Sequence, residues 1–328
     1  MGTTQEWPGG VEARPLSKTD TKAWAELLAA AEAVDDTGEH YSVEDLDDEL
    51  EDPKVNIATD TIGLWVDGFM VGYGGVRGPD EVLDVHRVMT EGTIHPEWRR
   101  RGLGGALLTW LAERSTGLHQ ERHPEAPGEI NNGVPSTNTI ARDMMVARGF
   151  EPCRYFFTMQ RQFQADPIPA TPLPDGLRLV VFDWPYDEAL RLAHNDAFRD
   201  HWGSTPKDAE TWKTWFTGSR AFRPELSSIV LDGDEIAAYT LGYEYVADTE
   251  ATGVKEVYVG QVGTRREYRG KGAGRAALAQ VLRLAEGLGF QRSALDVDGE
   301  NPTGALGLYQ SLGFTTTKQS IRYRRAIA

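Results

Sequence analysis

The sequence predicts two tandem α/β domains, each a mixed sheet flanked by helices. Three observations support this fold class. The chain has 328 residues, which is enough for two domains of about 100–200 residues each. The same order of strand and helix signals occurs twice. The stretch QADPIPATPLPDG (164–176) has four prolines and is typical of an extended linker. We therefore expect an N-terminal domain at 1–163 and a C-terminal domain at 177–328.

Each copy is expected to open with a strand and an amphipathic helix. The opening strands are VEARPL (11–16) and LRLVVF (177–182). Apolar residues then recur at helical spacing over 21–34 and 186–198. The two copies therefore begin in the same way.

A β-hairpin follows in each copy. Residues 61–77 are interrupted by Asp-Gly and residues 227–246 by Asp-Gly-Asp, and both sequences favour tight turns between strands. A further strand is expected at 85–96 and at 255–264, and each leads into a glycine-rich turn and a helix. The residue numbers support the repeat. A constant difference of 170 relates Arg99, Gly102 and Gly104 of the first copy to Arg269, Gly272 and Gly274 of the second.

The glycine-rich turns have the composition of an anion-binding loop. Glycine lets the backbone turn tightly and lets a ligand approach it. The N–H groups at a helix start and the helix dipole both favour a phosphate. A single basic loop of this kind could equally be a helix cap, but its repetition after a strand in both halves favours a binding site. The pattern is neither a P-loop nor the dinucleotide-binding GxGxxG.

Composition excludes several other classes. A formal net charge of −16 argues against nucleic-acid binding, which needs a basic face. Cys153 is the only cysteine, so neither an internal disulfide nor a thiolate metal site is expected. His119 and His123 lack the glutamate of an HExxH zinc motif. No apolar run is long enough to span a membrane and the first residues do not form a secretory signal, so a cytoplasmic location is expected.

Two segments of the C-terminal half carry a family resemblance. RGKGAG (269–274), like RRRGLG (99–104), resembles motif A of the GCN5-related N-acetyltransferase (GNAT) family, and DVDGENPTGALGLYQSLGF (296–314) is similar to its motif B. The resemblance covers most of 175–328 and is weaker in 1–163. It implies two tandem GNAT domains, acetyl-CoA as acyl donor, no metal, and direct transfer of the acetyl group to an amine.

The resemblance also implies a set of cofactor-binding residues. The pantetheine would bond to the backbone at Gln261, Val262 and Thr264, with Asn301 bonding it or capping the next helix. The pyrophosphate would lie on the loop made by Arg269, Gly270, Lys271, Gly272, Ala273, Gly274 and Arg275. The matching positions of the first loop are Arg99, Arg101, Gly102 and Gly104.

The catalytic expectations depend on Tyr309 and Glu256. In the family a tyrosine at the position of Tyr309 lies at the CoA sulfur, so this side chain is the expected general acid; alternatively it is a core aromatic. Glu256 is the expected base, or else an anchor for the substrate ammonium group. In the first copy Met145 takes the place of Tyr309, and a thioether cannot donate a proton. Subtraction places His86 at the position of Glu256.

The first copy therefore looks degenerate. Its segment 119–137 is polar and broken by proline where motif B has a clean strand, and Asn138 is one position out of step. We expect the chemistry in the C-terminal domain and a structural or weakly binding role for the N-terminal one. The two domains would mimic a dimer within a monomeric chain.

The acceptor site is less well predicted. Trp202 is a candidate for the substrate wall, whereas Trp212 and Trp215, at i and i+3, fit core packing for at least one of them. EVYV (256–259) and YQSLGFT (309–315) resemble the mycothiol synthase-like group of actinobacteria, but a lysine of that group is absent from 241–248. The amine therefore stays unassigned. A non-catalytic acetyl-CoA sensor or partner module, and a protein N-acetyltransferase, are the alternatives.

Overall fold

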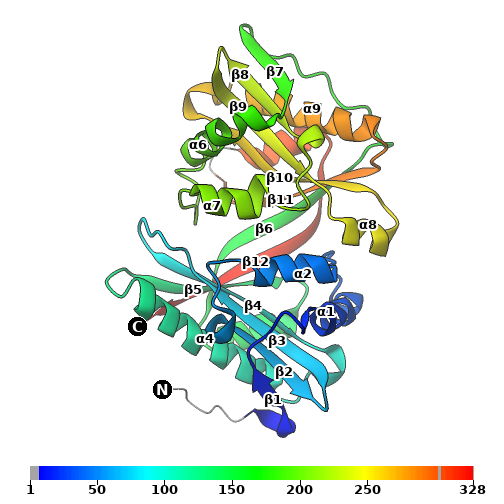
Figure 1. Ribbon diagram of the computed structural model, residues 1–328. Coiled ribbons are helices and arrows are strands. Elements are labelled where there is room, and N and C mark those ends of the chain that lie inside the picture. Colours follow the sequence, from blue (N-terminus) through cyan, green and yellow to red (C-terminus); the bar gives the residue numbers. More distant parts are fainter. Residues whose placement is uncertain (1–6, 302–303, 328) are drawn as a thin grey trace. The chain divides into compact units, whose positions relative to one another are not determined.

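The chain divides into two compact units in a computed structural model that describes residues 7–301 and 304–327 (Figure 1). The first unit contains residues 1–154 and 320–328, and the second contains residues 155–319. Pro302 and Thr303 of the motif B segment lie outside the described residues, as do residues 1–6 of the segment compared with secretory signals.

The first unit is a mixed sheet with helices on both faces. Its strands, in the order in which they pair, are β1 (Glu12–Arg14), β2 (Thr61–Val66), β3 (Phe69–Arg77), β4 (His86–Ile94), β5 (Gly128–Pro135) and the end of β12 (Thr315–Ile327). Among the strand pairs described for this unit, only β4 and β5 are parallel. Its helices are α1 (Thr21–Asp35), α2 (Val43–Leu50), α3 (Ile57–Asp60), α4 (Leu103–Arg122) and α5 (Thr139–Ala147).

Apolar side chains from the two faces of this sheet form separate clusters. Leu27 of α1 and Leu46 of α2 pack with Trp65 and Met70 on one face. Leu107 of α4 packs on the other face, among apolar residues of β2, β3 and β4. Because successive strand residues alternate between faces, the strands supply both clusters at once.

The second unit repeats this plan. Its strands pair in the order β6 (Glu151–Gln162), β11 (Arg292–Asp298), β10 (Glu256–Thr264), β9 (Glu235–Tyr243), β8 (Ser228–Asp232) and β7 (Leu177–Val181). Its helices are α6 (Asp187–Ala197), α7 (Ala209–Trp212), α8 (Val246–Thr252), α9 (Ala273–Gly287) and α10 (Ala305–Ser311). In the described part of this unit, β10 and β11 alone pair in parallel.

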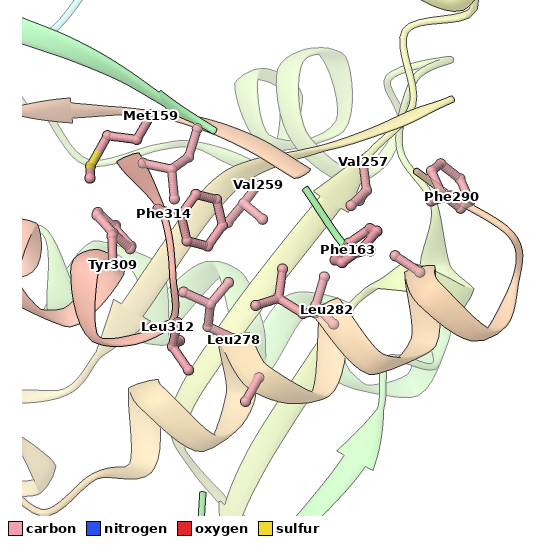
Figure 2. Close-up of a cluster of buried hydrophobic side chains, with 14 of the residues drawn as sticks. Met159, Phe163, Val257, Val259, Leu278, Leu282, Phe290, Tyr309, Leu312 and Phe314 are labelled. Carbon is pink, nitrogen blue, oxygen red and sulfur yellow. The ribbon is translucent and has the colours of Figure 1, made fainter. Parts of the chain in front are cut away.

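The larger core of the second unit lies between α9, α10 and the sheet. Leu278 and Leu282 of α9 pack against Val257 and Val259 of β10, as Figure 2 shows. Tyr309 of α10 belongs to the same cluster. A second cluster on the α6 side contains Trp212, so its predicted core role is confirmed.

The two sequence repeats exchange their last strands, β6 and β12. β6 begins in the first unit, but its residues 156–162 pair with β11 of the second. β12 begins in the second unit, and its residues 320–327 pair with β5 of the first. The compact units thus differ from the division expected at 164–176, because residues 156–162 of the first repeat pair with β11 of the second repeat, and residues 320–327 of the second repeat pair with β5 of the first. The proline-rich stretch lies within the second unit, where the Pro169 carbonyl accepts a bond from Arg283 at 3.0 Å.

Both hairpin predictions are confirmed. Asp67 and Gly68 connect β2 to β3 with φ of 48° and 79°, and Gly233 turns β8 into β9 with φ of 58°. These positive values explain the Asp and Gly found there. The expectation of a disrupted segment at 119–137 is wrong: residues 128–135 form β5, which pairs with β4 and β12.

Candidate active site

The central feature of the second unit is a strand that separates from its neighbour. β10 pairs with β11 only from Glu256 to Tyr258, although it pairs with β9 as far as Thr264. A bulge at Gly260 shifts the register with β9, and a Cβ on Gly260 would lie 2.5 Å from the Tyr243 ring. Among the described residues, the β11-facing backbone edge of β10 therefore has no ladder partner after Tyr258.

The loop after β10 presents a row of unpaired N–H groups. Gly270 and Gly272 have φ of 73° and 89°, and no atom lies within 4 Å of a Cβ built on either. The first backbone N–H of α9 with a described acceptor is that of Ala276, which donates to the Gly272 carbonyl at 2.9 Å. In the described part of the chain, the N–H groups of residues 270–275 have no protein acceptor. They and the positive end of α9 suit a phosphate group.

Gly274 fixes the loop against the end of β10. A Cβ on this residue would lie 2.5 Å from the Thr264 Oγ1, which is closer than nonbonded heavy atoms approach each other. The absence of a side chain at position 274 therefore lets the first turn of α9 come close to the strand end without moving the Thr264 side chain. This close approach brings the unpaired edge of β10 and the unpaired N–H groups together.

The Arg269 side chain stabilises the loop through contacts within the protein. Its Nε donates to the Thr264 carbonyl at 3.2 Å and an Nη donates to the Ala197 carbonyl at 2.8 Å. Asp200 lies 3.9 Å from the other Nη and also pairs with Arg266. The residue thus ties the loop to β10 and to the end of α6.

The side chains of Lys271 and Arg275 make different contacts. Lys271 is exposed and its ammonium group lies 5.6 Å from the centre of the Tyr268 ring. The Arg275 Nε donates to the Ser311 Oγ at 3.2 Å, which links α9 to α10. Lys271 is therefore the better placed of the two to approach a bound anion.

Tyr309 is the one buried residue of α10. Its ring lies in the core cluster beside Met159 and Phe314 (Figure 2), and its hydroxyl has no hydrogen-bond partner among the described residues. Burial raises the pKa of Tyr309 to about 12, because the phenolate would lose its hydration. The hydroxyl therefore stays protonated at neutral pH.

Glu256 lies at the start of β10, directly opposite Arg292 in the parallel ladder. The two side chains form a half-buried ion pair. Burial raises the pKa of Glu256 above its usual range, and the guanidinium of Arg292 opposes this rise. Nearby, the Tyr258 hydroxyl donates to Asp296 at 3.0 Å and the Tyr258 ring meets Tyr245 at 5.7 Å. Carboxylates and aromatic rings thus gather at the paired end of β10.

The other expected residues have mixed outcomes. Trp202 is half-buried in the turn after α6, two residues from the Asp200 that pairs with Arg266. Asn301 does not cap α10, because Gly304 is the N-cap residue. Trp215 is 39% exposed, whereas the indole of Trp212 donates to Asp187 at 2.7 Å.

The first unit has a loop at 99–104 that corresponds to the loop at 269–274 of the second unit, but different side chains surround it. Arg99 repeats the role of Arg269: its Nε donates to the Ile94 carbonyl at 2.9 Å and both Nη atoms bond Asp35 at 2.7 Å. Gly102 is again the left-handed N-cap residue, and a Cβ on Gly104 would lie 3.7 Å from the Met144 sulfur. The guanidinium of Arg101 lies over Trp98.

Two positions predicted to be equivalent can be compared between the units. Met145 is the one buried residue of α5, as Tyr309 is of α10, so the predicted correspondence of these positions fits the structure. The correspondence of His86 with Glu256 is wrong. The bulge at Gly260 adds one residue to β10 that β4 does not have, and this shifts all earlier positions by one.

Arg87 is the residue that corresponds to Glu256. It stands opposite Glu129 in the parallel ladder, and its Nε lies 3.8 Å from the Glu129 carboxylate. This pair has the reversed charges of Glu256 and Arg292. His86 points instead into the core on the α4 side, where its Nδ1 lies 3.0 Å from the Nδ1 of His119. The first unit therefore has neither a phenol nor a carboxylate at these two positions.

Comparison with known proteins identifies the family. The model of the "Acetyltransferase (GNAT) family" matches residues 188–314. A mycothiol acetyltransferase of Thermobispora bispora is 31% identical over 239 residues, which cover 71% of this chain and 74% of that protein. The chain belongs to the GNAT family.

Two further comparisons cover both units of this GNAT chain. A mycothiol acetyltransferase of Salinispora arenicola is 28% identical over 323 residues, 95% of this chain and 94% of that protein. The crystal structure of a GCN5-related N-acetyltransferase from Sphaerobacter thermophilus superposes with a TM-score of 0.77 at 26% identity and covers 98% of this chain and 97% of that one. The chain is thus an acyl-CoA-dependent N-acetyltransferase with two tandem GNAT domains. In the described residues no helix could cross a membrane, and no group of three or more His, Cys, Asp or Glu side chains is arranged to hold a metal ion.

Proposed function

We propose that the second unit transfers the acetyl group of acetyl-CoA directly to the primary amine of a small molecule. The observation that carries this proposal is the Tyr309 hydroxyl, which has no described partner and belongs to the unit with the open edge of β10. The first unit has a similar loop but a thioether at this position. Only the second unit therefore combines a phosphate-binding loop with a proton donor.

The residues of the second unit fit acetyl-CoA. The N–H groups of residues 270–275, which lack a described acceptor, would hold the pyrophosphate, and Lys271 would add charge. The unpaired edge of β10 offers the backbone groups of Val262 and Thr264 to the amides of the pantetheine, whereas the backbone groups of Gln261 point to β9. When bound, acetyl-CoA supplies an activated acetyl group as a thioester.

Tyr309 would hold the proton that the departing sulfur needs. Its pKa of about 12 keeps the proton on the hydroxyl oxygen throughout the neutral range. A thiolate becomes a better leaving group when a hydrogen bond or a proton stabilises its charge. No covalent intermediate is needed, so the absence of a paired nucleophilic cysteine is consistent with this chemistry.

Glu256 would accept the proton from the incoming amine. An ammonium group cannot attack a carbonyl, so the enzyme needs a base at its acceptor side. The raised pKa of Glu256 brings the carboxylate closer to the working pH and makes it a better base than an exposed glutamate. Tyr258, Tyr245 and Trp202 are the aromatic residues that we assign to the wall of the acceptor site.

A panel of primary amines tests this function. The full chain is incubated with acetyl-CoA and small amines, including the acceptor of mycothiol acetyltransferases, and released CoA is measured with a thiol reagent. We expect CoA release at least about tenfold above hydrolysis for one small amine, with the acetylated product confirmed by mass spectrometry. Acetyl-CoA binding without turnover over the panel would favour a sensor or partner module, and turnover only with peptides would favour a protein N-acetyltransferase.

A further inference from the structure

A buried arginine lies at the C-terminal end of the helix that carries Tyr309. Arg161, near the end of β6, is only 3% exposed. One of its Nη atoms donates to the Leu312 carbonyl at 2.5 Å, and the other donates to the Asp166 carbonyl at 2.5 Å. Leu312 is the C-cap residue of α10. The guanidinium of Arg161 thus joins the end of α10 to the proline-rich stretch at 164–176.

Helix α10 needs support from outside its own backbone. It has only seven residues, and so short a helix makes few internal hydrogen bonds and leaves its last carbonyl groups without helical partners. A positive charge near a helix C-terminus is also favourable, because it faces the negative end of the dipole. Burial lowers the pKa of Arg161, and the charges of Asp166 and Glu286 act in the opposite direction. The guanidinium stays charged at neutral pH and supplies both a donor and a charge at this helix end.

Gly313 leaves the space that the guanidinium occupies. Its φ of 85° is left-handed, which is typical of the glycine that follows a helix C-cap residue. A Cβ built on Gly313 would overlap an Nη atom of Arg161 and would lie 3.2 Å from its Cζ. A side chain here would therefore displace the arginine as well as strain the backbone. The end of α10 and the Arg161 side chain thus have complementary shapes.

The contact made by Arg161 lies one helical turn from Tyr309. The Tyr309 carbonyl accepts from the N–H groups of Leu312 at 3.0 Å and Phe314 at 3.1 Å, and the ring centres of Tyr309 and Phe314 lie 6.1 Å apart. Met159 precedes Arg161 by two residues, so it lies on the same face of β6, and it packs in the cluster that contains Tyr309 (Figure 2). Strand β6 thus supports the position of Tyr309 at two points.

The first unit has a matching arginine at the end of α5. A constant difference of 164 relates three pairs of residues: Arg161 and Arg325, Met145 and Tyr309, and Arg148 and Leu312. Arg325 of β12 donates from an Nη to the Arg148 carbonyl at 3.3 Å, and its guanidinium lies 4.8 Å from the centre of the Phe150 ring. An arginine thus supports this helix end in both units, but the supported helix carries a phenol in the second unit and a thioether in the first.

We propose that Arg161 is a positioning residue for the acetyl transfer. This inference rests on the proposed role of Tyr309 as general acid. By holding the end of α10, Arg161 keeps the Tyr309 hydroxyl where the departing sulfur needs its proton, and catalysis is sensitive to a displacement of about 1 Å. Lysine cannot replace Arg161, because one ammonium group does not reproduce the planar fork that bonds two carbonyl groups at once.

Double-mutant kinetics test whether Arg161 acts through Tyr309. Values of kcat for CoA release and of acetyl-CoA affinity are measured for Arg161→Lys in the parent chain and in the Tyr309→Phe chain. In the parent chain we expect kcat to fall about tenfold and acetyl-CoA affinity to stay within about twofold, because the loop at 269–275 is untouched. In the Tyr309→Phe chain the same change should lower kcat less than about twofold, because no phenol is left to be positioned.

Two further variants complete the comparison. Arg325→Lys makes the same change at the matching position of the first unit and should leave kcat unchanged. Arg161→Met removes the buried charge and should repeat the loss of kcat if Arg161→Lys fails to fold. The proposal is overturned if the Arg161 variants keep the parent kcat, if Arg325→Lys lowers kcat to the same extent, or if kcat falls by the same factor with and without the Tyr309 hydroxyl. Failure of both Arg161 variants to fold would also overturn it, because Arg161 would then serve the fold alone.

A spectroscopic signal separates this inference from the proposed function. Tyrosine labelled with ¹³C at Cζ gives eleven ring signals for the eleven tyrosines, and Tyr309→Phe assigns the relevant one. Arg161→Lys should shift the Tyr309 signal, whereas Arg325→Lys should not. A parent-like kcat in Tyr309→Phe would contradict the proposed function, but the shift would still show that Arg161 fixes the position of Tyr309. An unmoved Tyr309 signal in Arg161→Lys would overturn the positioning role.

Discussion

At the scale of single residues, the reversed ion pairs show how one scaffold can serve two units. Glu256 with Arg292 and Arg87 with Glu129 occupy the same position in the two parallel ladders. In either pair, each half-buried charged side chain lies next to one of opposite charge, so neither charge is left without a partner. Only the pair of the second unit places its carboxylate, that of Glu256, on the strand that leads into the glycine-rich loop, where we propose that it accepts a proton.

Arg292→Gln should change the pH dependence of the reaction. Arg292 lowers the pKa of Glu256 against the effect of burial, so its removal should raise that pKa and move the acid limb of kcat/KM to higher pH by about one unit. Glu256→Gln should abolish this limb. Arg324→Gln, at a partly exposed arginine in the first unit, is the control. An unchanged limb in Arg292→Gln would contradict the assignment of Glu256 as base.

His194 should make the second unit sensitive to acid. Its ring is buried, its Nδ1 lies 2.6 Å from the Tyr239 hydroxyl, and burial lowers its pKa from 6.5 to about 3. Between these values the unfolded chain binds a proton that the folded chain does not, so stability falls as the pH falls below about 6.5. His194→Gln cannot titrate and should show a flatter decline of the urea-unfolding midpoint between pH 7 and 4. An equal slope in the variant would refute this role. His86, with a pKa of about 4, adds a similar dependence in the first unit.

At the scale of elements, the contact between β10 and α9 determines the shape of the loop. Gly274→Ala would place a methyl group 2.5 Å from the Thr264 Oγ1 and push the helix start away. We expect acetyl-CoA binding to weaken about tenfold, measured by calorimetry, because displaced N–H groups lose charge-assisted bonds. Thr264→Ala in the same chain should restore part of the loss. Gly287→Ala, at the exposed end of α9 with no atom within 4 Å, should bind normally. Equal affinity in all variants would contradict this account.

The sequence predicted the elements well, because periodicity and turn residues are local signals. The hairpins, the helices after the opening strands and the glycine-rich loops all lie where expected. The bulge at Gly260 could not be predicted, since one extra residue in a strand leaves no clear pattern, and this is why counting selected His86 over Arg87. The structural role of Arg269 was missed because its acceptors, the carbonyls of Thr264 and Ala197, depend on tertiary contacts.

At the scale of the whole molecule, the exchange of β6 and β12 makes each unit depend on a strand from the other repeat. No sequence pattern in β6 or β12 predicts its partner strand, because strands that are far apart in the sequence pair only when the sheet assembles. Ile321 and Tyr323 of β12 pack with Ile130 and Phe150 of the first unit. The end of β12 thus completes the core of the first unit.

Removal of residues 320–328 should therefore destabilise the first unit. The amides of β5 would lose their partner strand, so hydrogen exchange at 128–135 should accelerate while β11 keeps its protection. Tyr323→Ala is the milder variant and should lower the unfolding free energy by about 3–5 kcal/mol, the range of large core aromatics. Unchanged protection of β5 after the truncation would show that the exchanged strand does not support the first unit.

We propose that the second unit alone carries the chemistry, because it has Tyr309 where the first has Met145. The measurement is kcat for CoA release by Tyr309→Phe and by Met145→Leu, with acetyl-CoA affinity determined for both. Tyr309→Phe should lower kcat about 100-fold or more with little change in acetyl-CoA affinity, as expected for loss of a general acid. Met145→Leu should leave kcat unchanged. A Tyr309→Phe variant with the kcat of the parent protein, or a large loss of kcat in Met145→Leu, would contradict the account.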